Sequence, residues 1–140
     1  MADVNGKPVR LVVAHPLAPV SIDNFGHRHE AMAALAAYAV QQPITMVIMG
    51  DFNLTSRSFY FRDFIRQSRL RRVNLGHGLK PTWCYDGAGR SLSHLEQVKQ
   101  MFKIPIEHIF VSQDVSVDQV ITPASSVSDH RPAIARLRMI

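Results

Sequence analysis

One stretch decides how this 140-residue chain folds: ITMVIMGDFN, residues 44–53. Its first six residues are all apolar or β-branched, which is typical of a strand buried on both faces of a sheet. The apolar run stops at Gly50, and the polar side chains of Asp51 and Asn53 follow. Ligands of α/β sheets bind beyond the carboxyl ends of the strands, so these two side chains form a candidate site. The alternative is an ordinary turn, because Gly, Asp and Asn are also common turn residues.

The residues before this stretch predict a second strand and a helix. A hairpin-type turn at Asn5-Gly6 precedes an expected strand over 9–14, and apolar residues at helical spacing indicate a helix from about residue 27 to 41. Only four residues precede the turn, so we expect the chain to begin inside a sheet. A strand–helix–strand unit gives parallel neighbouring strands, which would place His15 and Asp51 at the same edge.

The residues after this stretch predict a second helix and several further strands. Ser56 or Ser58 is the expected first residue of a helix that ends near Ser68. The remaining expected segments are a short strand at 70–74, a loop-rich stretch at 76–90, a helical or irregular segment at 91–102, and strands at 106–111, 115–121 and 133–139. These segments predict an α/β domain with a mixed sheet.

Length and composition are typical of a single domain, residues 1–140, with an anionic partner. The formal charge is +5, and 12 of the 16 basic residues are Arg, whose planar fork matches phosphate. Cys84 is the only cysteine, so no disulfide can form within the chain. The longest apolar run, 31–40, is shorter than the roughly 20 residues that span a bilayer. None of these features indicates a cellular location.

Five short motifs occur in a characteristic order: His15-Pro16, residues 50–53, Pro81-Thr82-Trp83, residues 106–108, and residues 128–132. As an ordered set they resemble the endonuclease/exonuclease/phosphatase superfamily, and in particular its deoxyribonuclease-like and uncharacterised bacterial members. The resemblance implies a four-layer α/β sandwich. The chain corresponds to its C-terminal half, a mixed sheet with helices on one face and the partner sheet largely missing.

The chain departs from this family pattern at two places. Glu107 stands where the family has Asp, which moves the carboxylate one methylene further from the backbone. The family also has an N-terminal half with a metal-binding glutamate and a substrate-binding asparagine, and no counterpart precedes Val9. The resemblance therefore covers a partial domain.

The resemblance assigns catalytic roles to residues in four of these motifs. Asp51 would orient or deprotonate the attacking water, and Asn53 would hold the phosphate. His130, hydrogen-bonded to Glu107, would stabilise or protonate a phosphate oxygen. His15 matches the second histidine of the deoxyribonuclease-like members. If these roles are correct, these five side chains and that of Asp129 should lie at one end of one sheet.

The resemblance also assigns metal and substrate binding. Asp129, together with Asp51, would support a divalent ion, for which Mg²⁺ is expected and Mn²⁺ is a second candidate. Arg131 and Trp83 are assigned to the substrate, although an isolated tryptophan equally fits a core or a pocket wall. His108 alternates away from Glu107 along its expected strand, which favours packing over catalysis.

These assignments favour a metal-dependent phosphoester hydrolase domain that acts on phosphodiesters, with nucleic acid as one candidate substrate, and is weakly active or inactive alone. The alternative is a catalytically silent phosphate- or nucleic-acid-binding module, or a scaffold, that keeps the half-fold. A calcineurin-type phosphoesterase shares the Gly-Asp start but needs a second Asp and Gly-Asn-His motifs that this sequence lacks. We also expect self-association through the sheet face that the missing half leaves exposed.

Overall fold

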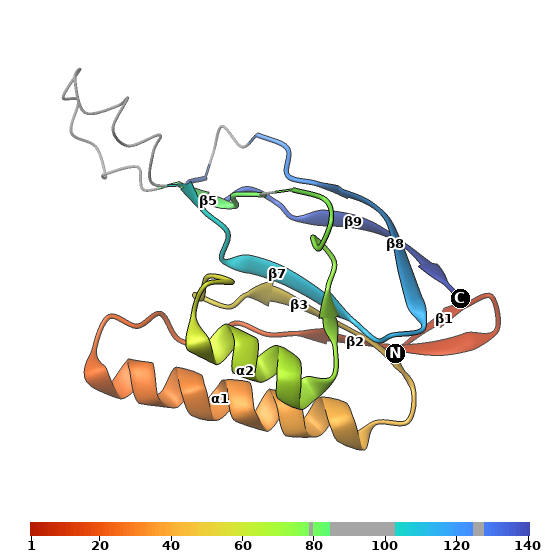
Figure 1. Cartoon of the computed structure of the whole chain (residues 1–140), viewed down its shortest axis with the longest axis horizontal. Coiled ribbons are helices and arrows are strands. Elements are labelled where there is room, and N and C mark those ends of the chain that lie inside the picture. Colours follow the sequence, from red (N-terminus) through yellow and green to blue (C-terminus); the bar gives the residue numbers. More distant parts are fainter. Residues whose placement is uncertain (79, 85–102, 125–127) are drawn as a thin grey trace.

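The computed structural model shows a three-layer α/β arrangement, in which two helices cover one face of a central sheet and a β-hairpin covers the other (Figure 1). The described residues are 1–78, 80–84, 103–124 and 128–140. This arrangement confirms the predicted partial α/β sandwich with a mixed sheet. The segment at 91–102, expected to be helical or irregular, lies outside the described residues.

The central sheet has five strands in the order β1-β2-β3-β7-β4. Their bounds are Ala2–Val4 for β1, Lys7–Val13 for β2, Thr45–Asp51 for β3, Glu107–Val111 for β7 and Arg71–Arg72 for β4. The two predicted strands β2 and β3 are parallel, as expected, whereas β7 runs antiparallel to β3. Because β7 runs in the opposite direction, the end of β3 and the beginning of β7 meet at one edge of the sheet.

A tight hairpin joins β1 to β2 at the predicted turn. Asn5 and Gly6 both have positive φ angles, 55° and 78°, as the two central residues of a type I′ turn require. The four residues before the turn are therefore enough to form a strand, and Ala2 pairs antiparallel with Val9.

Helix α1 spans Ile22–Gln41 and helix α2 spans Phe59–Ser68. Each begins after a serine cap: Ser21 accepts a hydrogen bond from the Asn24 backbone, and Ser58 accepts one from Tyr60. The first helix starts five residues before the predicted position. Its first turn is polar or exposed, so the apolar periodicity that marks the rest of the helix is missing there.

Two apolar layers lie on opposite faces of β3. Its side chains alternate, so that Met46 and Ile48 pack against the helices while Val47 packs against the hairpin. The helix-side cluster of buried residues comprises Met32, Ala36, Ala39, Met46, Ile48, Phe52, Leu54, Phe61, Phe64, Leu70 and Phe110. The hairpin-side cluster comprises Val9, Val47, Val73, Val111, Val115 and Val120. Burial on both faces confirms the prediction made from the apolar run.

Two small sheets complete the described structure. The hairpin on the second face pairs β8 (Val115–Ile121) with β9 (Ile134–Met139). The other sheet pairs β5 (Trp83–Cys84) with β6 (Lys103–Ile104). The predicted loop at 76–90 therefore contains a two-residue strand, which brings Trp83 beside His130 through an isolated β-bridge.

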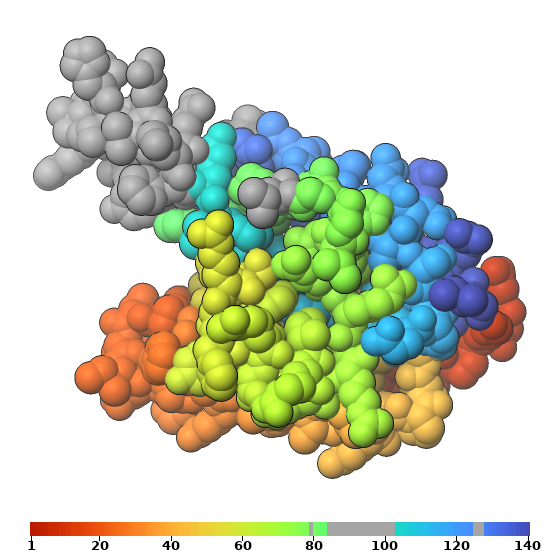
Figure 2. Space-filling model, viewed as in Figure 1, coloured from red at the N-terminus to blue at the C-terminus, as the bar shows by residue number. Residues whose placement is uncertain are grey.

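The surface of the helical layer is continuous, with α1 and α2 side by side in the lower part of the space-filling view (Figure 2). Neither of these two described helices has the length and apolar character needed to cross a membrane. On β2, Leu11 and Val13 are exposed large apolar side chains. They are consistent with the expected self-association, which stays a prediction.

Candidate active site

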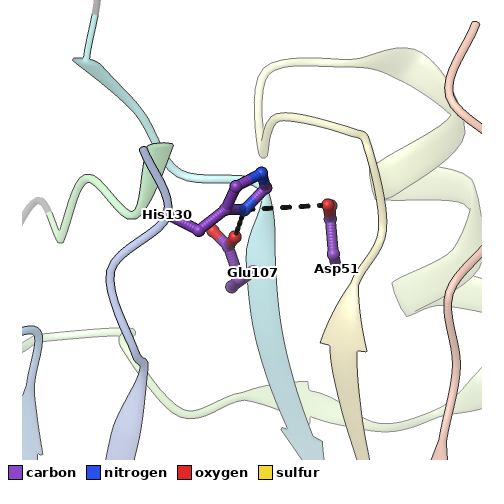
Figure 3. Close-up of side chains that lie close together, drawn as sticks. All are labelled: Asp51, Glu107 and His130. Carbon is purple, nitrogen blue, oxygen red and sulfur yellow. Dashed lines mark hydrogen bonds and ion pairs between the residues drawn. The ribbon is translucent and has the colours of Figure 1, made fainter. Parts of the chain in front are cut away.

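Three predicted site residues come together where β3 ends and β7 begins. Asp51 is the last residue of β3 and lies directly opposite Glu107, the first residue of β7. His130 reaches them from the segment before β9, and its Nδ1 donates a hydrogen bond to Glu107 Oε1 (Figure 3). One side-chain ligand atom from each residue lies within 4.8 Å of the others. The antiparallel register of β3 and β7 thus brings Asp51 and Glu107 together.

The Asp51 carboxylate has one oxygen fixed and the other directed toward two histidines. Its Oδ1 accepts a hydrogen bond from the Asn53 backbone N–H at 2.7 Å. Its Oδ2 lies 3.7 Å from His15 Nε2 and 3.9 Å from His130 Nδ1. The side chain of Asp51 is 17% exposed and that of His15 is 71% exposed, so His15 borders the site from the solvent side.

His130 is oriented by its own backbone and by Glu107. Its backbone N–H donates to Ser128 Oγ at 3.0 Å, and its Nδ1 is directed at the Glu107 carboxylate. Burial lowers the pKa of His130, but the Glu107 hydrogen bond and the negative charges of Glu107, Asp129 and Asp51 raise it more, so the net shift is upward. In Figure 3 the second ring nitrogen, Nε2, points away from both carboxylates. It is therefore placed to meet a ligand.

Asn53 links three segments around the site. Its φ is 49°, a left-handed conformation that asparagine tolerates better than most residues. Its side-chain amide donates to Pro16 O at 3.1 Å, which ties down the loop that carries His15. Its carbonyl accepts a hydrogen bond from Arg28 Nη1 at 2.7 Å. Sequence reasoning identified Asn53 but missed Arg28, because a single arginine in a helix has no distinguishing pattern.

Thr82 is a second residue that sequence reasoning missed. Fully buried, it accepts hydrogen bonds at its Oγ1 from the backbone N–H groups of Ile106 and Glu107, both at 3.1 Å. Its carbonyl accepts the Arg131 N–H at 2.6 Å. Thr82 therefore joins the start of β7, through its hydroxyl, to the segment that carries His130, through its carbonyl. The signal was present in Pro81-Thr82-Trp83, where a small polar residue separates two bulky ones.

The remaining predicted residues border this cluster. Asp129 lies outside the three-residue group, and its Oδ2 accepts a hydrogen bond from Trp83 Nε1 at 3.0 Å. Arg131 is fixed through its backbone and is partly exposed. The predicted contribution of Asp129 to metal binding and of Arg131 and Trp83 to substrate binding stays a prediction.

The donor atoms present fit a hard divalent cation. Asp51 and Glu107 supply carboxylate oxygens, which Mg²⁺ and Mn²⁺ prefer. Among the described residues, Glu107 Oε2 is buried and has no hydrogen-bond partner. A buried carboxylate oxygen without a partner is costly, and a cation is one partner that would satisfy it.

His108 packs in the core, as predicted, on the face of β7 opposite Glu107. Its side chain is 3% exposed and lies among the rings of Phe52, Phe61 and Phe110, and its Nε2 donates to Leu54 O at 2.7 Å. Burial is the largest cause that lowers the pKa of His108 to about 4, with a smaller contribution from Arg72, while the Leu54 hydrogen bond and Asp51 oppose the shift.

This shift predicts a loss of stability in mild acid. Between the folded pKa of about 4 and the ordinary value of 6.5, the unfolded chain binds a proton at His108 that the folded chain does not. The free energy of unfolding should therefore fall by about 2 kcal/mol from pH 7 to pH 5 through this residue alone. Urea unfolding of the native chain and of His108→Gln, at pH 7 and at pH 5, measures this fall in the free energy of unfolding. The variant should lose this part of the pH dependence, whereas His27→Gln, at an exposed position, should retain it.

Comparisons with known proteins agree with this geometry. The sequence matches the Endonuclease/Exonuclease/phosphatase family over residues 2–130. A search of curated proteins gave no significant match.

Among solved structures, a functionally unknown conserved protein from Enterococcus faecalis is 18% identical with a TM-score of 0.67, and the alignment covers 93% of this chain and 50% of that one. The human Nocturnin catalytic domain with bound sulfate is 16% identical with a TM-score of 0.67, covering 97% and 49%. Staphylococcus aureus beta toxin with bound magnesium is 17% identical with a TM-score of 0.57, covering 95% and 54%. This chain thus spans about half the length of these structures.

Structural matches at this level of identity support the fold, and the sequence match extends over most of the chain, including every motif up to His130. The chain belongs to the endonuclease/exonuclease/phosphatase family.

Proposed function

We propose that this chain carries the hydrolytic half of a metal-dependent phosphodiesterase site. The observation that carries the proposal is the cluster of Asp51, Glu107 and His130, in which an acid and a hydrogen-bonded acid–histidine pair face one another. Members of this family are typically metal-dependent phosphoester hydrolases, and the assignment to phosphodiesters is ours. The excess of arginine in the chain favours such an anionic substrate.

Asp51 is the proposed base. Hydrolysis forms a bond between a water oxygen and phosphorus, breaks the bond from phosphorus to the leaving oxygen, and moves a proton from the water to a base. The Asn53 N–H fixes Asp51 Oδ1, which leaves Oδ2 to accept this proton. His15, 3.7 Å from Oδ2, would help to hold the water in place.

His130 is the proposed donor to the phosphate. Glu107 holds its Nδ1 and raises its pKa, so the protonated ring can donate from Nε2 to a phosphate oxygen or to the leaving oxygen. Asn53 would supply its second amide hydrogen to another phosphate oxygen. These donors act on charge that develops during the reaction, which is where preorganised hydrogen bonds are most effective.

A divalent cation, Mg²⁺ or Mn²⁺, would be held by Asp51 and Glu107, with Asp129 as the further carboxylate assigned from the resemblance. When bound, it would withdraw charge from a phosphate oxygen as a Lewis acid. Of these carboxylates, the described cluster contains only Asp51 and Glu107, and Mg²⁺ binds poorly to one or two carboxylates without substrate phosphate. This chain spans only about half the length of the related structures, which supports low metal occupancy and low activity for this chain alone.

The same observation, that this chain spans about half the length of the related structures, favours a second candidate function, a phosphate-binding module without turnover. Such a module would bind inorganic phosphate or nucleic acid through Asn53 and Arg131 but would not hydrolyse a phosphodiester. Turnover separates the two functions, because binding alone is common to both.

The test is a hydrolysis assay on this chain and on any longer product of the same reading frame. With bis(4-nitrophenyl) phosphate, DNA, RNA and a phospholipid as substrates, we expect activity that requires Mg²⁺ or Mn²⁺, is abolished by EDTA and is restored by the metal. The 140-residue chain should be at least about a hundredfold slower than a form with a complete metal site. Binding of phosphate without any turnover, in every form, would favour the module instead.

A further inference from the structure

Arg28 is a buried cation to which the proposed chemistry assigns no role. It lies in the second turn of α1, and only 4% of its surface is exposed. Its Nη1 donates to Asn53 O at 2.7 Å, and its Nη2 lies 3.5 Å from His29 Nε2. The guanidinium carbon is 5.1 Å from the centre of the Phe25 ring. Of the described buried polar atoms, Arg28 Nε is one of two without a hydrogen-bond partner.

No carboxylate among the residues that the structure describes forms an ion pair with Arg28. Within the described ranges of the chain, Tyr60 is the only group whose charge favours the protonated form of Arg28. Burial lowers the pKa of Arg28, which shows that the environment disfavours the cation. Burial, and then the charge of Arg28, lower the pKa of the neighbouring His29. Burying an unpaired charge is costly, so a bound anion near Arg28 would be favourable.

The contact made by Arg28 indicates what that partner is. The only residue outside α1 to which the guanidinium is hydrogen-bonded, among those the structure describes, is Asn53. Asn53 has a strained left-handed backbone and also binds Asp51 and the loop that carries His15. The guanidinium of Arg28 is therefore hydrogen-bonded to the backbone of the residue proposed to hold the phosphate.

We propose that Arg28 is a positioning residue of the phosphoester site: it holds the left-handed backbone of Asn53 through the Asn53 carbonyl, and its charge is balanced by the phosphate that binds at Asn53. This inference rests on the proposed function. It differs from a purely structural role, in which the hydrogen bond to Asn53 alone matters and the charge of Arg28 is incidental.

Two substitutions separate these roles, since each keeps a hydrogen-bond donor but only one keeps the charge. Arg28→Gln retains an N–H for Asn53 O and removes the charge, whereas Arg28→Lys retains the charge and removes the planar fork. Inorganic phosphate is the probe, titrated into the ¹⁵N-labelled full chain with Mg²⁺ while the amide signals of Asn53 are followed. Arg66→Gln is the matched control, because Arg66 is exposed and paired with Asp63 on α2.

We expect Arg28→Lys to bind phosphate within about threefold of the native chain and Arg28→Gln to bind about tenfold more weakly. Arg66→Gln should bind like the native chain. Equal affinities for the lysine and glutamine variants would overturn the inference. If the glutamine variant does not fold, the lysine variant decides: binding within threefold supports the role of the charge, and a tenfold loss overturns it.

Absence of phosphate binding by the native chain at Asn53 would contradict the proposed function itself. Phosphate binding that is unaffected by the charge at residue 28 would contradict only the role of Arg28. The two failures are therefore distinguishable in the same titration.

Discussion

Asp51→Asn should lower the rate of phosphodiester hydrolysis about a thousandfold in the most active form of the protein. The substitution replaces one carboxylate oxygen with an amide nitrogen of nearly the same size. An oxygen remains to accept the Asn53 N–H, so the loop should keep its place. The amide cannot take a proton from water, and it is also a poorer ligand for a divalent cation. The loss should therefore appear in the rate of the chemical step.

Single-turnover kinetics with bis(4-nitrophenyl) phosphate measure this step directly. Asp63→Asn is the matched control, because Asp63 is a carboxylate on α2 that pairs with Arg66 and Gln67 on the same helix. We expect the control to retain native activity and His130→Ala to lose activity to a similar extent as Asp51→Asn. Native-like turnover by a well-folded Asp51→Asn variant would contradict the assignment of the base.

Gly50→Ala should have the largest effect on the fold. Gly50 has a φ of 147°, which side-chain-bearing residues rarely adopt, and a Cβ built there lies 2.0 Å from the Ala14 carbonyl oxygen of the parallel neighbour strand. A methyl group cannot fit without separating β2 from β3 beside Asp51. We expect the free energy of unfolding to fall by about 3 kcal/mol or more.

Urea unfolding of Gly50→Ala against Gly26→Ala tests this prediction. Gly26 lies within α1, and a Cβ there meets no atom within 4 Å. Alanine at that helical position should stabilise the protein by up to about 1 kcal/mol. If both variants have the same midpoint of urea unfolding as the native chain, the close approach of β2 and β3 is not a constraint on the fold.

Local patterns predicted most of the elements that position the site. The apolar run before Gly50 was sufficient for β3. The helical spacing of Met32, Leu35, Ala36 and Ala39 was sufficient for the inward face of α1, on which Leu35 is only partly buried. These features depend on residues close together in the chain, where side-chain alternation and helical periodicity are direct physical signals. The resemblance to a family then predicted that Glu107 and His130 would meet Asp51.

The contacts that hold the site were harder to predict. Thr82 and Arg28 each act through hydrogen bonds to backbone groups far away in the sequence, and a backbone acceptor leaves no mark in the residue types. The order of strands was equally inaccessible, because the position of β7 between β3 and β4 depends on the pairing of distant segments. A sequence pattern shows which face of a strand is buried, but not which strand lies beside it.

The antiparallel pairing of β7 with β3 also determines when the site can form during folding. The β2–α1–β3 unit is contiguous, so Asp51 and Asn53 can reach their places early, through contacts that close short loops. Glu107 and His130 arrive only after the chain has closed the much longer loop between β3 and β7. A partly folded chain would therefore have Asp51 in place while His130 is still absent from the site. We therefore expect the proposed site to be completed late in folding, when this distant strand pairing has formed.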